Sequence, residues 1–231
     1  MTSLKSEILI DANILRKNIK TIKNKLQKKS KFMAVIKSDA YGHNLSSIVK
    51  DIDDLVDGYG VVRIEEALEI RKQSNKKVLL MQGVYSKEEY ILSKNQKLDL
   101  VIHNNNQFNL IKDEENHEMF WYKVNTGMNR LGFEIPDFIK IYEKFLTGKQ
   151  FTLMSHLASS NDKDNPANES QFKSFNDLSN KLNKNILKSI ANTGCIMNFP
   201  EFSMDWVRCG IGIYGGYLKD DQLKTAMTLR S

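Results

Sequence analysis

Eight short apolar runs, separated by segments with helical patterns, constrain the fold of this sequence more than any other feature. The runs occupy residues 32–36, 59–62, 78–81, 98–102, 120–124, 151–154, 186–190 and 211–214. Neighbouring parallel strands need a crossover connection, usually a helix, so this alternation predicts repeated β-α units. Eight such units in 231 residues fit a (β/α)8 barrel, an α/β fold, better than a doubly wound sheet.

The segments between the runs carry the helical signal. Helices are expected over residues 44–52, 64–71, 87–92, 107–112, 137–145 and 169–182. Ahead of the first run, a short strand is expected over residues 7–11, followed by a helix whose apolar stripe is Leu15, Ile19, Ile22 and Leu26. With three prolines and no Ser/Gly-rich linker, nothing in the sequence predicts a domain break in mid-chain.

Composition and charge exclude several classes of protein. Hydrophobic residues make up 41% of the chain, which is too apolar for a disordered protein. The net charge of +6 is scattered and does not favour nucleic-acid binding. Cys195 and Cys209 lack the spacing of a metal or redox motif and are expected as free thiols in a reducing compartment.

Targeting signals are also missing from the sequence. No apolar run approaches the ~18 residues of a membrane span, and the first residues lack the apolar core of a signal peptide. We therefore expect a soluble, cytoplasmic protein with no metal site and with no nucleic acid or membrane as partner.

Polar side chains follow most of the predicted strands, at the end where barrels of this class form their active sites. These residues are Lys37, Arg63, His103, Lys123, Arg130, His156, Asn192, Thr193, Arg208 and Gly210. One such residue means little, because many strands simply stop at a polar position. Lysine, histidine and two arginines converging on one rim predict a functional site.

Lys37 is the most reactive candidate because it directly follows a buried apolar strand. Partial removal from water favours the neutral amine, which is a nucleophile and can form a Schiff base with an aldehyde. From this segment alone, the alternative is that Lys37 is an ordinary lysine at a strand end, whose long side chain carries its charge to the solvent.

The longer motif decides between these readings. Residues 34–43, AVIKSDAYGH, resemble the pyridoxal-phosphate (PLP) lysine motif of alanine racemases. Further segments resemble that family in the same order along the chain: residues 60–67 (GVVRIEEA), 123–132 (KVNTGMNRLG), 155–158 (SHLA), 191–193 (ANT) and 205–215 (DWVRCGIGIYG). The chain is identified as a member of this family on these motifs.

The resemblance implies a function and a set of site residues. It implies PLP-dependent interconversion of L-alanine and D-alanine by two bases, which supplies D-alanine for bacterial peptidoglycan. The implied catalytic residues are Lys37, Arg130, His156 and Arg208. The implied cofactor contacts are Lys37, Tyr41, His156, Asn192, Thr193, Arg208, Gly210 and Ile211.

The resemblance also implies a role for each group. Lys37 would carry PLP as a Schiff base, and Tyr41 and Thr193, with the amides near Gly210 and Ile211, would hold its phosphate. Arg208 would face the pyridine nitrogen and be oriented by His156. Arg130 would bind the substrate carboxylate, and Lys123, the possible carboxylated lysine, would hold Arg130 as a carbamate.

The sequence departs from the family pattern at a few positions. Asn125 replaces the usual Asp, Asn129 stands where Gly is frequent, and Asn44 replaces a Gly. Thr193 stands for Ser and keeps the hydroxyl, while Cys209 replaces Pro. None of these changes removes a catalytic group, although Asn125 removes a carboxylate near Arg130.

Two alternatives stay open at this point. One is a non-catalytic, single-domain PLP-binding barrel concerned with cofactor homeostasis, and the other is a racemase of another amino acid such as serine or lysine. The first is disfavoured by the AYGH run, by the TGMNR loop and by Arg208.

The final residues carry a further expectation. By resemblance, residues 1–222 form the PLP-binding barrel, and residues 223–231 begin a C-terminal β domain that is otherwise absent. In the family the second base is a tyrosine from that domain of the partner subunit in a homodimer. The 231-residue chain is therefore expected to be inactive alone.

Overall fold

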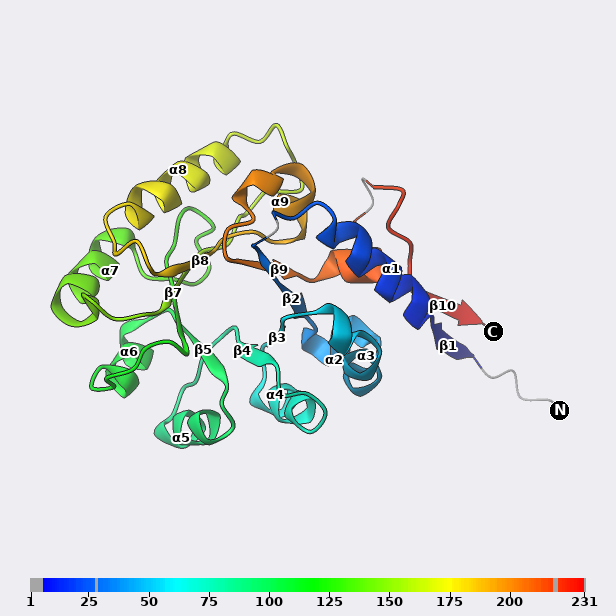
Figure 1. Cartoon of the computed structure of the whole chain (residues 1–231), viewed down its shortest axis with the longest axis horizontal. Coiled ribbons are helices and arrows are strands. Elements are labelled where there is room, and N and C mark those ends of the chain that lie inside the picture. Colours follow the sequence, from blue (N-terminus) through cyan, green and yellow to red (C-terminus); the bar gives the residue numbers. More distant parts are fainter. Residues whose placement is uncertain (1–5, 28, 218–219, 231) are drawn as a thin grey trace.

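The computed structural model describes residues 6–27, 29–217 and 220–230, and its centre is a parallel sheet of eight strands (Figure 1). In the order of the sheet, the strands are β8 (Leu187–Ser189), β7 (Thr152–Met154), β6 (Phe120–Lys123), β5 (Asp99–Ile102), β4 (Lys77–Leu80), β3 (Gly58–Val61), β2 (Lys31–Val35) and β9 (Trp206–Cys209). Each neighbouring pair in this order is parallel.

The sheet curls so that its two edge strands, β8 and β9, meet. The Arg208 N–H donates to the Ala191 carbonyl at 2.9 Å, and the Ser189 hydroxyl donates to the Trp206 carbonyl at 2.8 Å. These hydrogen bonds take the place of a full ladder, so the barrel is nearly closed. The predicted α/β barrel is confirmed.

Helices cover the outside of the strands (Figure 1). The longer ones are α1 (Ala12–Lys23), α3 (Leu45–Ile52), α4 (Ile64–Arg71), α5 (Lys87–Asn95), α6 (Asn105–Ile111), α7 (Ile135–Ile141), continued by η2 (Tyr142–Leu146), and α8 (Ala167–Ser179). Asp11, Ser86 and Asn104 begin α1, α5 and α6 by accepting hydrogen bonds from first-turn amides. The predicted helices are present, with ends that shift by a few residues.

The barrel interior has its own apolar cluster, which is distinct from the larger core between strands and helices. Its buried members are Met33, Leu79, Val101, Trp121, Met154 and Trp206. Because side chains alternate across a strand, the residues two positions after Trp121 and Trp206 face the same interior. These residues are Lys123 and Arg208, so charged groups lie above an apolar floor, toward the carboxyl ends of the strands.

The predicted eighth strand at residues 211–214 is wrong. That segment is a 3-10 helix, η4 (Ile211–Tyr214), and the eighth barrel strand is β9. Gly212, Ile213 and Tyr214 are buried, which explains the apolar signal without a strand. In β9 the charged Arg208 interrupts the apolar run that would otherwise have marked it as a strand.

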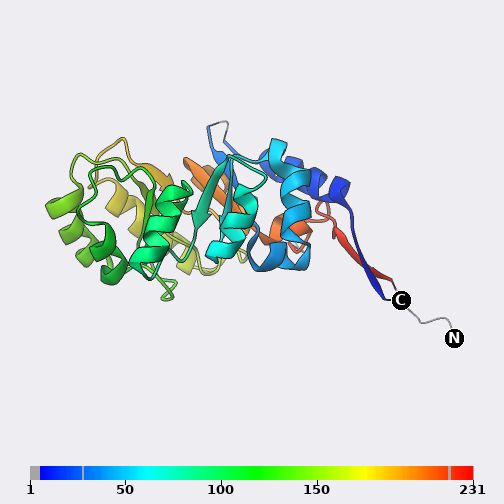
Figure 2. The ribbon, with the colours of Figure 1, turned by 90° about the horizontal axis from the view of Figure 1, so that it is seen from below.

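A two-stranded antiparallel ribbon lies outside the barrel. It pairs β1 (Glu7–Ile10) with β10 (Met227–Arg230), and Figure 2 shows it projecting from one end of the molecule. Ile8 lies opposite Leu229, and the two side chains are 58% and 70% exposed. The predicted strand at residues 7–11 is confirmed, and the division of the chain at residue 222 stays a prediction.

Asn18 on α1 ties the outer layer to the segments that follow β9. Its side chain is fully buried and donates to the Ile213 carbonyl at 3.0 Å and to the Lys224 carbonyl at 2.8 Å. Its carbonyl oxygen accepts from the Lys224 N–H at 3.0 Å. One amide therefore satisfies three backbone groups.

We predict that Asn18→Ala lowers the free energy of unfolding by about 2–4 kcal/mol, because it leaves backbone groups unpaired in or near the core. Urea denaturation of the two proteins measures the difference. Asn13→Ala, at an exposed position of the same helix, serves as the control and should change stability by less than about 0.5 kcal/mol. Equal effects of the two substitutions would contradict the assignment.

Candidate functional site

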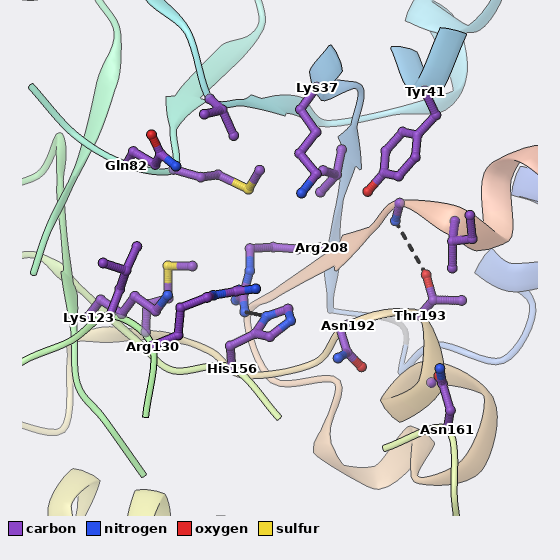
Figure 3. A pocket seen from close by; sticks show the side chains of 18 residues that line it. Lys37, Tyr41, Gln82, Lys123, Arg130, His156, Asn161, Asn192, Thr193 and Arg208 are labelled. Atoms are coloured by element: carbon purple, nitrogen blue, oxygen red, sulfur yellow. Dashed lines mark hydrogen bonds between the residues drawn. The ribbon is translucent and has the colours of Figure 1, made fainter. Parts of the chain in front are cut away.

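A cavity of about 490 Å³ opens at the carboxyl ends of the barrel strands. The site residues implied by the family resemblance all line it: Lys37, Tyr41, Lys123, Arg130, His156, Asn192, Thr193, Arg208, Gly210 and Ile211. Figure 3 shows Lys123, Arg130 and Gln82 toward one end, Tyr41, Thr193 and Asn161 toward the other, and Arg208 and His156 between them. The structure thus brings together predicted residues from five separate segments of the sequence, 37–41, 123–130, 156, 192–193 and 208–211.

The charge of this cavity is one-sided. Lys37, Lys123, Arg130 and Arg208 line it, and in the described part of the chain no carboxylate does. Cations gathered in a concave site of low dielectric attract anions strongly. The cavity is therefore suited to a small molecule with several negative charges.

Lys37 and Tyr41 stand on one wall because of an unusual backbone segment, α2 (Lys37–Gly42). Ser38, Asp39, Ala40 and Tyr41 have φ between 51° and 56°, so four consecutive non-glycine residues form a left-handed helical turn. Such residues cost roughly 1–2 kcal/mol each in this conformation. Positions four apart share a face of such a turn, and both side chains point into the cavity (Figure 3). Burial raises the pKa of the Tyr41 phenol.

Arg208 lies at the base of the cavity and is buried. Its guanidinium donates to the Ser189 hydroxyl and, at 2.6 Å, to the Ser155 carbonyl. Burial lowers its pKa to about 10, so it stays positively charged at neutral pH. A charged and fully oriented donor therefore faces the space above it.

His156 contacts this arginine, as the sequence predicts. Its Nδ1 lies 3.4 Å from an Arg208 Nη atom, which can only donate. Burial first, and then the positive charge of Arg208, hold the pKa of His156 well below its ordinary value. The ring is accordingly neutral, with Nδ1 as acceptor and Nε2 as donor.

Lys123 ends β6 and is buried beside the two arginines. Burial, followed by the charges of Arg208 and Arg130, lowers the pKa of its ammonium to about 8. A substantial fraction of the amine is neutral slightly above neutral pH. A neutral amine can react with electrophiles, including carbon dioxide.

The loop after β6 holds Arg130 at the mouth of the cavity, where its side chain is exposed. Asn125 organises this loop: its Oδ1 accepts from the Gly127 and Asn129 amides at 3.1 and 3.0 Å. Its amide group donates to Asn129 and, at 2.9 Å, to Glu134. Asn125 therefore organises the turn as an acceptor, a task that Asp could also perform, and as a donor to Glu134, which requires the amide.

The opposite end of the cavity is built from small residues and amides. The Thr193 hydroxyl lies within hydrogen-bond distance of the Gly210 and Gly212 amides, at 3.3 and 3.4 Å. A Cβ at Gly210 would lie 2.7 Å from the Tyr41 hydroxyl, and one at Gly194 would lie 2.2 Å from the Asn161 side chain. Because Gly194 and Gly210 have no side chains, backbone amides and hydroxyl groups come close together at this end of the cavity. Such a set of donors suits a phosphate group.

Asn192 fixes the chain that enters this pocket. It begins the short helix α9 (Thr193–Asn198) by accepting from the Cys195 amide at 3.1 Å. The same oxygen accepts from the Ser160 hydroxyl at 2.6 Å. Asn192 therefore sets the position of Thr193 next to it, besides lining the cavity itself.

Some lining residues were missed by the sequence reasoning. Gln82, Asn161 and Gly194 line the cavity. Gln82 follows the run at residues 78–81 and could have been found by the strand-end rule, whereas Asn161 lies in a loop with no such signal.

Two of the strand-end residues lie elsewhere. Arg63 lines a separate hollow beside α2. His103 is buried, and its Nε2 lies 3.2 Å from the carbonyl of Gln82, which lines the cavity. Burial lowers the pKa of His103, so its ring is neutral and supports the wall.

The structure describes residues 6–27, 29–217 and 220–230, and two features are absent from them. Over these ranges no group of three or more His, Cys, Asp or Glu side chains could hold a metal ion. None of the helices within the same ranges has the length and the apolar character needed to cross a membrane.

Comparison with known proteins places this cavity in context. The family described as alanine racemase, N-terminal domain, matches residues 10–218. An alanine racemase of Shewanella denitrificans is 33% identical over 216 residues, which cover 89% of this chain and 59% of that protein. An alanine racemase of Shewanella sediminis is 35% identical over 193 residues, 80% of this chain and 53% of that protein. The chain spans a little over half the length of these relatives.

Solved structures agree with the sequence relatives. Alanine racemase from Acinetobacter baumannii superposes with a TM-score of 0.89 at 31% identity, covering 97% of this chain and 66% of that one. The enzyme from Bartonella henselae, described as having covalently bound pyridoxal phosphate, gives a TM-score of 0.83 at 25% identity, covering 97% and 68%. A barrel with this cavity at its carboxyl end, matched by the family over residues 10–218, belongs to the alanine racemases as their N-terminal domain.

Proposed function

We propose that this chain binds pyridoxal 5'-phosphate covalently through Lys37 and forms the barrel part of an enzyme that interconverts L-alanine and D-alanine. The observation that carries the proposal is the position of Lys37 in a cavity lined by three further cations and by no described carboxylate. PLP has a phosphate, a phenolic oxygen and an aldehyde, and an amino-acid substrate adds a carboxylate. The charge of the site complements this ligand.

The residues present fit the cofactor. Thr193, Tyr41 and the amides of Gly210 and Ile211 would hold the phosphate, at a place where a Cβ on residue 210 would collide with the Tyr41 hydroxyl. Lys37 would supply the amine for the covalent bond. When bound, PLP withdraws electrons from the substrate Cα and so makes its proton removable.

Arg208 would face the pyridine nitrogen. Even with its pKa lowered to about 10, a guanidinium holds its protons at neutral pH and can offer only a hydrogen bond. Arg208 would therefore give no proton to the cofactor, and withholding that proton would disfavour transamination. His156 would keep Arg208 in orientation through its neutral Nδ1.

Lys37 and Arg130 would act on the substrate itself. The Lys37 amine would remove or return the proton on one face of Cα, and Arg130 would bind the carboxylate with its planar pair of N–H donors. Racemisation needs a second base on the opposite face. Tyr41 is the one tyrosine among the described lining residues, and it stands beside Lys37 on the same wall.

The second base is accordingly proposed to come from outside residues 1–231. By family resemblance it is a tyrosine from the C-terminal domain of the partner subunit, so we propose a homodimer for the full-length enzyme. We also propose a cytoplasmic location and a role in D-alanine supply for peptidoglycan. Assays of the full-length enzyme with alanine, serine and lysine decide which of these amino acids it racemises.

Lys123 is proposed to carry a carbamate. Two arginines next to an ammonium group repel it, and that repulsion together with burial brings its pKa to about 8. Addition of carbon dioxide to the neutral amine would turn a repelled cation into an anion that pairs with Arg130. The change removes an unfavourable contact and holds the arginine in place.

The first prediction concerns Lys37. Incubation with PLP followed by borohydride reduction should attach the cofactor irreversibly to Lys37, as located by peptide mass spectrometry. Lys37→Ala should abolish the labelling, whereas Lys17→Ala, at an exposed lysine of α1, should leave it unchanged. Equal labelling of the Lys37→Ala protein would show that the cavity does not direct the reaction.

The second prediction concerns the missing base. With PLP bound, the 231-residue chain should exchange the α-proton of D-alanine for solvent deuterium without inversion. Racemisation by this chain should be slower than that of the full-length enzyme by at least ~10²–10⁴-fold, the usual contribution of one general base. Chiral chromatography and mass spectrometry measure both products. Racemisation by residues 1–231 alone at ~1–10³ per second would refute the need for a second base.

The third prediction concerns Lys123 and follows from its lowered pKa. Because only the neutral amine reacts, acylation by acetic anhydride should rise with a midpoint near pH 8. A lysine peptide added as internal reference should titrate at about 10.4. Bicarbonate should protect Lys123 by forming the carbamate. Labelling that bicarbonate leaves unchanged would rule the carbamate out.

A further inference from the structure

We propose that Glu66 is a positioning residue that holds the left-handed turn after Lys37 in the conformation that aims Lys37 and Tyr41 into the cavity. The inference rests on the proposed function, because it concerns the turn that carries the proposed PLP lysine. Glu66 does not line the main cavity. It lies behind the turn, in the hollow lined by Ser38, Asp39 and Arg63.

The contacts of Glu66 join two strand ends. Its Oε1 accepts from the Ser38 amide at 2.6 Å and from the Asp39 amide at 3.4 Å. Its Oε2 accepts from the Val62 and Arg63 amides, both at 3.1 Å. One half-buried carboxylate therefore links the segment after β2 to the segment after β3 and the start of α4.

The turn needs such a support because its backbone conformation is costly. L-residues avoid the left-handed region, and Ser38–Tyr41 occupy it at four successive positions. The far end of the turn is tied down by the Asp39 carboxylate, which accepts from the Leu45 amide at 2.7 Å. At the near end the Ser38 amide donates to Glu66, directly beside the lysine.

The position of the lysine depends on this turn. Ser38 directly follows Lys37, so a change of the Ser38 φ and ψ angles moves Tyr41 relative to Lys37. In the observed turn Lys37 and Tyr41 share one face, with the Lys37 Nζ 5.9 Å from the Tyr41 ring centroid. Relaxation to a right-handed or irregular turn would separate the proposed covalent attachment point from the proposed phosphate ligand.

The test compares Glu66→Gln with Glu65→Gln in the 231-residue chain. Both remove one carboxylate from the first turn of α4, but Glu65 is exposed and accepts no hydrogen bond from the turn. In Glu66→Gln, one amide oxygen replaces two acceptors, and an N–H₂ group faces backbone donors. Hydrogen exchange by mass spectrometry should speed up in the peptide covering residues 36–44 by at least about tenfold, since bonds to charged acceptors are strong.

The equilibrium constant for the covalent PLP–Lys37 adduct should fall in Glu66→Gln by at least about tenfold and stay within about twofold in Glu65→Gln. Glu66 also caps the first turn of α4 by accepting from the Arg63 amide. Loss of this cap is therefore a second possible cause of weaker adduct formation. Ser38→Gly separates the two causes, because glycine tolerates positive φ and does not affect α4. The double variant Ser38→Gly/Glu66→Gln should regain about three- to tenfold in adduct formation.

Each outcome decides the proposal. If hydrogen exchange in residues 36–44 of Glu66→Gln is unchanged, Glu66 does not hold the turn. The proposal is also overturned if Glu66→Gln loses the PLP adduct and Ser38→Gly fails to restore it. If the unsubstituted chain forms no adduct with PLP, the proposed function fails. In that case the exchange measurement on the two single variants still decides whether Glu66 holds the turn.

Discussion

A single buried guanidinium connects the closure of this barrel with the chemistry of its cavity. The backbone of Arg208 bonds to Ala191, and its side chain bonds to Ser189 and to the Ser155 carbonyl, so this residue joins β9 to the segments at and after β8 and β7. A buried charge is costly unless its donors are satisfied. The groups that satisfy Arg208 are the ones that bring the sheet edges together, and the remaining face of the guanidinium points to the ligand space.

Burial, together with the cations around Arg208, sets the protonation of two neighbouring groups. Burial and positive neighbours make His156 neutral and bring the pKa of Lys123 to about 8. These shifts are the consequences of a site built to neutralise an anion that has several charges. In such a site Lys123 can be partly neutral while the arginines remain charged, because a guanidinium keeps its protons where this ammonium gives them up.

Much of the fold and the site could be predicted from the sequence, for specific physical reasons. Strands such as β5 and β6 are buried on both faces and read as apolar runs, and each has a polar residue, His103 or Lys123, at or directly after its end. The eighth strand escaped because Arg208 interrupts its apolar pattern, while Ile213 and Tyr214 are apolar for packing reasons. The left-handed turn could not be predicted from the sequence of Ser38–Tyr41. Its supporting hydrogen bonds come from Glu66, which is distant in sequence, and from Asp39 within the turn, and no periodic pattern of residues indicates such contacts.

We propose that the cavity binds PLP with its phosphate at Thr193 and its ring nitrogen toward Arg208. A crystal structure of the chain grown with PLP tests it most directly. The account predicts continuous density from the Lys37 Nζ to the cofactor, phosphate oxygens on the Gly210 and Ile211 amides, and an Arg208 nitrogen within hydrogen-bond distance of the ring nitrogen. Phosphate bound instead between Lys123 and Arg130, or a ring nitrogen that faces a group other than Arg208, would contradict it.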